Sequence, residues 1–158
     1  MRAIILAAGI GKRLQEEGKK QPKCFLKVGD KRLVERYVDT LTACGVNDIT
    51  FVLGYMAEEV QAHLENAYPS LGIDYIVNEE YLKGNILSAY AAAGSFDEPF
   101  ILMDADVAFP DELLKKLLDS PRANCLLLDT DFNNDAEEMK LGRSEERRVG
   151  KECRSRWS

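Results

Sequence analysis

The chain has 158 residues, of which 46% are hydrophobic and 30% are charged, so it has the size and composition of one globular domain. Its net charge is −6, but residues 143–158 carry +3, which leaves −9 on residues 1–142. Such an acidic body argues against a nucleic-acid partner, because a phosphate backbone requires a basic face. No apolar run reaches the roughly 20 residues of a membrane span. The scattered cysteines lack metal-ligand spacing and are typical of free thiols in a cytoplasmic protein.

Short apolar runs, often β-branched, alternate along the chain with segments of helical periodicity. The expected strands are residues 3–7, 49–53, 74–77, 100–103 and 124–128. The expected helices contain the apolar positions of residues 33–41, 56–64, 86–91 and 113–118. This alternation predicts right-handed βαβ units and an α/β fold with a mostly parallel, doubly wound, Rossmann-like sheet. Ligands of such sheets lie beyond the carboxyl ends of the strands, so the loops after Leu6, Val77 and Met103 are the places to search.

The first expected strand runs directly into the sequence LAAGIGKRL. Gly9 and Gly11 permit a tight turn whose exposed backbone N–H groups form an anion-binding concavity. Lys12 and Arg13 follow the turn and Lys23 comes soon after, so three cations accompany it in an otherwise acidic chain. This combination suits a triphosphate, whereas a generic strand–helix turn with solvated lysines is the alternative for the two glycines alone. The turn lacks the third glycine of a dinucleotide fingerprint and the G-K-[ST] of a P-loop.

Two carboxylates, Asp104 and Asp106, follow the expected strand at residues 100–103. Alternate residues of an extended chain point the same way. Two acids at this spacing can therefore hold a hard cation such as Mg²⁺, with phosphate oxygens and water as its remaining ligands. The alternative is a pair of solvated acids at a strand end. The single histidine, His63, lies among polar neighbours in an expected helix and is interpreted as a plain surface residue.

The string LAAGIGKRLQEEGKKQPKCFL resembles the signature L-A-A-G-x-G-x-R-L…P-K of the sugar-phosphate and phosphocholine nucleotidyltransferases. The resemblance implies a GT-A-like nucleotidyltransferase domain with Mg²⁺ as its cofactor. It implies that Arg13 holds the β- and γ-phosphates and that Lys23 bridges the α-phosphate and the incoming phosphate. Asp106 would bind the metal, with Asp104 as a secondary contact. The other residues of the loop expected to bind the nucleotide are Leu6, Ala7, Ala8, Gly9, Gly11 and Lys12.

The segment VNEEYLKGNILSAYAAA is similar to the corresponding segment of bacterial phosphocholine cytidylyltransferases, a group that also shows D-A-D. It is expected to form a loop that opens into a helix. Asn85, with Gly84, is expected to cap this helix and to read the edge of the base through hydrogen bonds; capping by Asn85 without a ligand is the alternative. For Tyr81 and Tyr90, packing within the protein is the preferred interpretation. The residues of this segment expected to bind the nucleotide are Asn78, Gly84, Asn85 and Ser88.

The last segment, RSEERRVGKECRSRWS, has no compositional continuity with the body of the chain. It resembles the in-frame translation of a DNA-sequencing adaptor; a disordered basic tail is the alternative. We therefore expect residues 143–158 to be a non-native tail. Residues 1–142 are expected to be the N-terminal portion of a nucleotidyltransferase domain, with a sheet that is incomplete at its C-terminus.

The function implied is transfer of a nucleoside monophosphate from an NTP, with CTP favoured, to a phosphorylated small molecule, with release of pyrophosphate. Phosphocholine or a sugar phosphate would be the acceptor, and neither nucleic acid nor membrane would be a partner. One alternative is a metal-dependent GT-A-type glycosyltransferase, because Asp104-Ala105-Asp106 is a D-x-D motif. The other is a non-catalytic nucleotide-binding fragment.

Overall fold

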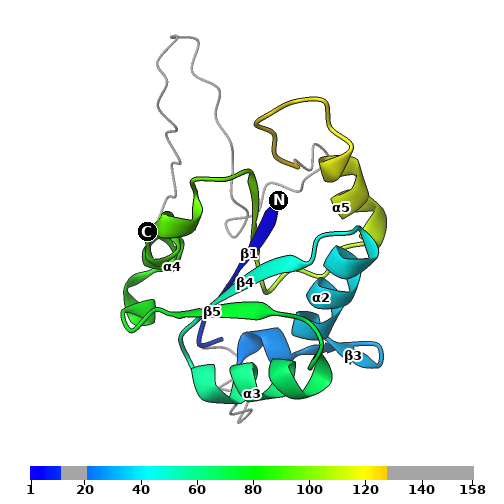
Figure 1. Ribbon diagram of the computed structural model, residues 1–158. Coiled ribbons are helices and arrows are strands. Elements are labelled where there is room, and N and C mark those ends of the chain that lie inside the picture. The colour runs from blue at the N-terminus through cyan, green and yellow to red at the C-terminus, as the bar shows by residue number, and fades with distance from the viewer. Residues whose placement is uncertain (12–20, 128–158) are drawn as a thin grey trace, which may run out of the picture. The chain divides into compact units, whose positions relative to one another are not determined.

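The computed structural model describes residues 1–11 and 21–127 (Figure 1). The chain divides into two compact units, Met1–Cys125 and Leu126–Ser158. Every helix and strand described below lies in the first unit. None of the helices in the described residues combines the length and the apolar character that crossing a bilayer requires.

A four-stranded parallel sheet forms the centre of the first unit, in the order β5-β4-β1-β6 (Figure 1). Its strands are β1 (Arg2–Ala7), β4 (Asp48–Leu53), β5 (Ile73–Val77) and β6 (Phe100–Asp104). Both ends of each strand lie within one residue of the expected ends. This agreement confirms the predicted α/β class and the parallel sheet. In the register of β1, Leu6 lies opposite Val52 of β4 and Asp104 of β6.

Helices connect the strands, as the βαβ pattern predicts. The connecting helices are α2 (Leu33–Ala43), α3 (Ala57–Ala67) and α4 (Asn85–Ala91), and α5 (Asp111–Leu118) follows β6. Short elements complete the unit: the 3-10 helices η1 (Lys23–Phe25), η2 (Tyr81–Lys83) and η3 (Ala93–Ser95), and an antiparallel hairpin of β2 (Lys27–Val28) and β3 (Lys31–Arg32). Gly45, with a φ of 80°, follows α2 at the predicted C-terminal glycine position.

The two faces of the sheet are covered by different helices, as a doubly wound fold requires. Alternation along β1 sends Ala3 and Ile5 into the larger core, which α2, α3 and α5 cover. It sends Ile4 to the opposite face, where Ile4 packs with Val52 and with Ala92 at the end of α4. All five of these side chains are fully buried. The core therefore fixes β1 and β4 from both sides, and with them the loops that follow these strands.

The expected strand at residues 124–128 is wrong for the residues that the structure describes. Residues 124–127 form no strand and are exposed, and Leu128 lies outside the described range. The prediction rested on a short apolar run, and a strand also needs a neighbour with which to form a hydrogen-bonded ladder. Within the described part of the chain, β6 pairs with β1 alone, so no ladder includes residues 124–127.

The chain crosses the sheet between β5 and β6. The strands β1, β4 and β5 follow one another outward in one direction, and β6 then returns to the opposite side of β1. Strand order therefore reverses beside β1. In open α/β sheets, ligands usually bind at such a reversal, beyond the carboxyl ends of the strands.

Candidate active site

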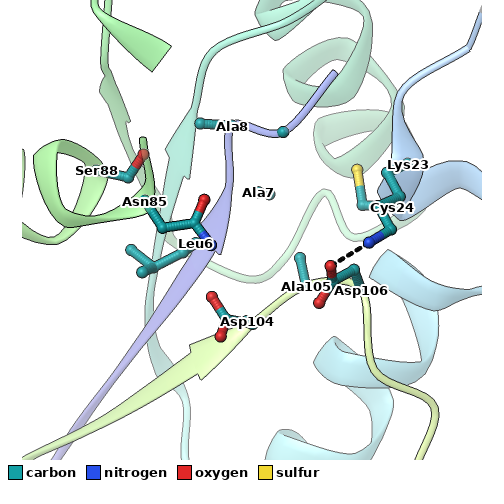
Figure 2. A pocket seen from close by; sticks show the side chains of 11 residues that line it. Leu6, Ala7, Ala8, Lys23, Cys24, Asn85, Ser88, Asp104, Ala105 and Asp106 are labelled. Carbon is teal, nitrogen blue, oxygen red and sulfur yellow. Dashed lines mark hydrogen bonds and ion pairs between the residues drawn. The ribbon is translucent and has the colours of Figure 1, made fainter. Parts of the chain in front are cut away.

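A hollow of about 370 Å³, open to solvent, lies at the carboxyl ends of β1 and β6 (Figure 2). It brings together residues from β1, η1, α4 and the loop after β6, which are distant in sequence. Its lining residues are Leu6, Ala7, Ala8, Gly9, Lys23, Cys24, Asn85, Ser88, Asp104, Ala105 and Asp106.

The end of β1 forms one wall of this pocket. The backbone of the wall is held on both sides, because Ala105 N–H donates to the Leu6 carbonyl at 3.0 Å and Tyr55 N–H donates to the Ala8 carbonyl at 3.2 Å. Ala7 and Ala8 are each 5% exposed, so their small side chains leave the backbone close to the hollow. Gly9 follows and is exposed. The wall thus offers the pocket backbone groups and little side-chain bulk.

Gly54, directly after β4, allows three loops to meet behind this wall. A Cβ built at Gly54 would lie 2.7 Å from Cβ of Tyr81 and 2.9 Å from Cβ of Ala8. Real Cβ atoms do not approach other atoms so closely. Glycine is therefore required here by packing, since Tyr81 occupies the space that a side chain would need. The predicted packing role of Tyr81 is confirmed, whereas Tyr90 is 76% exposed and the packing predicted for it is wrong.

Lys23 and Asp106 form an ion pair at the mouth of the pocket (Figure 2). Lys23 opens η1, directly after the buried Pro22, and Asp106 belongs to the loop after β6. The side chains of both residues stay partly exposed, at 42% and 37%. The ammonium and the carboxylate therefore remain accessible to a ligand that enters the hollow.

Asp104 is the last residue of β6 and is separated from Asp106 by Ala105. It also lines the pocket (Figure 2). Burial raises the pKa of this carboxyl group, and the negative charge of Asp106 raises it further, while the nearby Lys23 ammonium opposes both effects. Two carboxylates that repel each other in a partly buried pocket favour the binding of a cation.

The remaining wall is built by α4 and the loop before it. Asn85 and Ser88 reach the pocket from this helix. Asn78 lies behind them, 5% exposed, and its side-chain amide donates to the Ser88 hydroxyl at 3.0 Å. The side-chain oxygen of Asn78 accepts a hydrogen bond from Glu80 N–H at 2.9 Å. The backbone N–H of Asn78 donates to the Leu53 carbonyl at 2.8 Å. Asn78 therefore supports the wall and is not among the lining residues.

The helix α4 begins at Asn85, whereas an N-cap at Asn85 would require the helix to begin at Ile86. Gly84 occupies the N-cap position with a φ of 123°, a conformation that side chains rarely permit, and Asn85 is the first helical residue. Of the two residues predicted to cap the helix, Gly84 is the N-cap, whereas the capping role predicted for Asn85 is wrong. The Asn85 amide is instead directed to the hollow (Figure 2).

Comparison with known proteins identifies the family of this chain. The family described as MobA-like NTP transferase domain matches residues 3–139, most of the chain. The chain belongs to this family. The CTP:phosphoglutamine cytidylyltransferase of Campylobacter jejuni is 29% identical over 136 residues, which cover 82% of this chain and 53% of that protein. The choline-phosphate cytidylyltransferase of Streptococcus pneumoniae is 34% identical over 107 residues, which cover 67% of this chain and 44% of that protein.

A solved structure has the same fold. The inositol-1-phosphate CTP transferase from T. maritima is 26% identical and superposes with a TM-score of 0.64, over 73% of this chain and 47% of that one. The chain thus spans about half the length of these relatives. The predicted resemblance to nucleotidyltransferases, including the phosphocholine enzymes, is confirmed at the level of the family.

The predicted site residues of the MobA-like domain divide into three groups. Nine line the pocket: Leu6, Ala7, Ala8, Gly9, Lys23, Asn85, Ser88, Asp104 and Asp106. Gly11, Asn78 and Gly84 are described but do not line it. Lys12 and Arg13 lie outside the described residues.

Sequence reasoning did not single out two further lining residues, Cys24 and Ala105, although each is adjacent to a residue that it did select. Cys24 is 2% exposed, and burial raises the pKa of its thiol to about 12, so the thiol is neutral at physiological pH. Ala105 is 3% exposed and separates the two aspartates. Adjacency to Lys23 and to Asp106 was the signal that could have identified both.

His63 is not the plain surface residue that the sequence predicted. It is half-buried against α2, where its Nε2 lies 2.8 Å from the Glu35 carboxylate and its Nδ1 lies 3.1 Å from the Arg32 guanidinium. The Phe25 ring meets its imidazole edge-on, with the ring centres 5.1 Å apart. This cluster ties α3 to the start of α2 and does not contribute to the pocket.

The donor set of the pocket fits a magnesium ion that shares its ligands with a substrate. Asp104 and Asp106 supply carboxylate oxygens, the ligand type that Mg²⁺ prefers. Within residues 1–11 and 21–127, no group of three or more histidine, cysteine or acidic residues forms a ready-made metal cage. A metal held by two carboxylates would need phosphate oxygens and water as its remaining ligands, which is how Mg²⁺ binds in phosphoryl-transfer enzymes.

Proposed function

We propose that this chain carries the nucleotide site of a magnesium-dependent cytidylyltransferase. The reaction would transfer CMP from CTP to a phosphorylated small molecule and release pyrophosphate. A cytoplasmic location is part of the proposal and rests on the scattered cysteines of the sequence, which form no C-x-x-C pair. The observation that carries the proposal is the meeting of Lys23 with Asp106 beside the bare backbone at the end of β1.

Backbone groups and charged side chains of the pocket would bind different parts of the nucleotide. Backbone groups of the β1 turn, from Leu6 to Gly9, would contact the nucleotide, because this wall presents main chain to the hollow. Lys23 would neutralise the phosphates at the reacting centre. Arg13, which lies outside the described residues, remains predicted from sequence to hold the departing phosphates. The described lining contains one cation and two carboxylates, so a triphosphate requires further positive charge from the metal and the glycine loop.

Asp104 and Asp106 would hold Mg²⁺, whose charge neutralises the phosphate oxygens when it is bound. An oxygen of the acceptor phosphate would attack the α-phosphorus and form a new P–O–P bond. The bond from the α-phosphorus to the bridging oxygen would break, and pyrophosphate would leave with that electron pair. The attacking oxygen is already anionic, so no general base is needed, and positioning and charge carry the catalysis.

The base and the acceptor class are inferred from the relatives. The names of all three relatives refer to CTP or to cytidylyl transfer, and the acceptors in these names are phosphoglutamine, choline phosphate and inositol 1-phosphate. The shared chemistry is a phosphorylated polar molecule of small size. Among these, phosphocholine is our specific proposal for the acceptor.

A matrix of common NTPs and phosphorylated acceptors, assayed for pyrophosphate release, tests the proposal. We expect release that requires both CTP and an acceptor phosphate. Release of free NDP from a nucleotide-sugar would instead support a glycosyltransferase, the class to which the Asp104-Ala105-Asp106 motif also belongs. Nucleotide that raises the melting temperature without turnover would support a non-catalytic binding domain.

A further inference from the structure

The loop after β6 begins next to Asp104 and carries Asp106, whose carboxylate is paired with the exposed Lys23. After Asp104 ends β6, Ala105 is buried, but Asp106 is exposed and Val107 is 52% exposed. Burial of the loop's own side chains therefore does not fix the position of the Asp106 carboxylate. On the side toward β1, the loop is tied by the hydrogen bond from Ala105 N–H to the Leu6 carbonyl.

On its other side, the loop is held by the hydroxyl of Tyr37. This residue lies on α2, 67 positions before Asp104, and is 2% exposed. Its hydroxyl contacts the carbonyl oxygens of both Asp104 and Val107, the latter at 2.8 Å, and its single proton is shared between them. The same oxygen accepts from Val107 N–H at 3.3 Å. One side-chain group thus contacts the backbone on both sides of the Ala105–Asp106 segment.

The Tyr37 ring is itself fixed, so its hydroxyl is a rigid support. It packs in the main core and meets the Phe109 ring edge-on, with the ring centres 5.3 Å apart. A phenol is protonated at neutral pH and can donate, and burial raises the pKa of this one further. Tyr37 does not line the pocket and cannot touch a ligand there.

We propose that Tyr37 is a positioning residue, whose hydroxyl holds the loop so that Asp104 and Asp106 face one ligand. Its effect on metal and nucleotide rests on the proposed function, while its effect on the loop does not. Groups that orient metal ligands from behind are commonly worth roughly 10- to 100-fold in metal affinity.

The substitution Tyr37→Phe tests this, because it removes the hydroxyl and keeps the ring that packs on Phe109. Tyr68→Phe is the matched control. The Tyr68 hydroxyl also contacts two acceptors, the Glu35 carbonyl at 3.1 Å and the Asp39 carboxylate at 2.9 Å, but it lies away from the pocket. A purely structural role for Tyr37 would make the two variants alike.

The first measurement is amide hydrogen exchange at Val107 in the ligand-free chain. Tyr37→Phe should accelerate this exchange by roughly tenfold, since Val107 N–H loses its acceptor, and Tyr68→Phe should leave it unchanged. Equal exchange at Val107 in wild type and Tyr37→Phe would overturn the proposal that the hydroxyl holds the loop.

The second measurement is Mn²⁺ binding in the presence of CTP, followed by electron paramagnetic resonance. Tyr37→Phe should weaken this binding by about 10-fold or more, whereas Tyr68→Phe should change it less than about 2-fold. Wild type that binds Mn²⁺–CTP no better than Tyr37→Phe would refute the positioning role and leave the proposed function intact. Absence of Mn²⁺–CTP binding to wild type, together with faster Val107 exchange in the variant, would refute the proposed function and leave the loop support standing.

Discussion

The ammonium group of Lys23 pairs with the carboxylate of Asp106, although 83 residues separate them in the chain. The topology explains the contact, because β6 returns to the side of β1 and its loop then lies beside η1. Both groups are more than one-third exposed, and an ion pair so exposed stabilises a fold by only about 0–1 kcal/mol. The pair therefore matters less for stability than for the two charges it places at the pocket mouth.

The substitution Lys23→Ala should separate these two roles. We expect little change in the free energy of unfolding, since the ion pair is exposed. We expect kcat/KM for pyrophosphate release to fall roughly 10²- to 10³-fold, the effect of removing a preorganised charge worth about 3–4 kcal/mol to the transition state. Lys27→Ala removes an exposed lysine outside the pocket and is the matched control. Activity of Lys23→Ala equal to that of the control would contradict the assignment.

The substitution Gly54→Ala should destabilise the domain and disturb the pocket together. Its Cβ would overlap Tyr81 and Ala8, and overpacking of this kind costs about 1–3 kcal/mol. Ala8 lines the pocket, so nucleotide affinity should fall as well. Urea unfolding and nucleotide titration measure the two effects. Gly94→Ala is the control, because a Cβ at Gly94 would meet nothing within 4 Å; equal stability of the two variants would show that the close approach is not real.

Alkaline pH should destabilise the fold in part through Tyr75. Burial raises the pKa of this phenol from 10.0 to about 12, so between these values the unfolded chain loses the proton that the folded chain retains. Folding stability therefore falls as pH rises through this window. Tyr75→Phe should show a shallower fall in urea-unfolding free energy across the same window. An unchanged slope would mean that the phenol is not buried as described.

The same variant should be tolerated at neutral pH. The Tyr75 hydroxyl is buried and has no hydrogen-bond partner among the described residues, so its removal breaks no hydrogen bond. Stability equal to wild type or slightly higher is the expected result. A large loss would indicate a partner for this hydroxyl in solution.

The parallel sheet was predictable because its signal is local. Residues such as Ile49 and Phe51 of β4 are fully buried, and buried parallel strands appear in the sequence as short apolar runs. Once the strands are parallel, their carboxyl ends share one edge, so the turn at Gly9 and the acids after β6 had to converge. The apolar run at residues 124–127 carries the same local signal, but it pairs with no strand of the described residues and is not part of the sheet.

The parts of the site that escaped prediction depend on contacts between distant residues. Asn78 has the same polar chemistry as Asn85, yet it is buried behind Ser88 while Asn85 faces the hollow. The need for glycine at position 54 arises from Tyr81, and the support of the Asp104–Asp106 loop comes from Tyr37 on another helix. No local pattern encodes such relationships, because each is set by how the elements pack.

The most direct test of the central claim is CTP binding, with and without Mg²⁺, to wild type and to Asp106→Asn by isothermal titration calorimetry. Asp119→Asn, at an exposed acid outside the pocket, serves as the control. We predict that wild type and Asp119→Asn bind CTP more tightly with Mg²⁺, and that Asp106→Asn loses this dependence because a metal ligand is gone. Magnesium stimulation that is unchanged in Asp106→Asn, or no CTP binding by wild type, would contradict it.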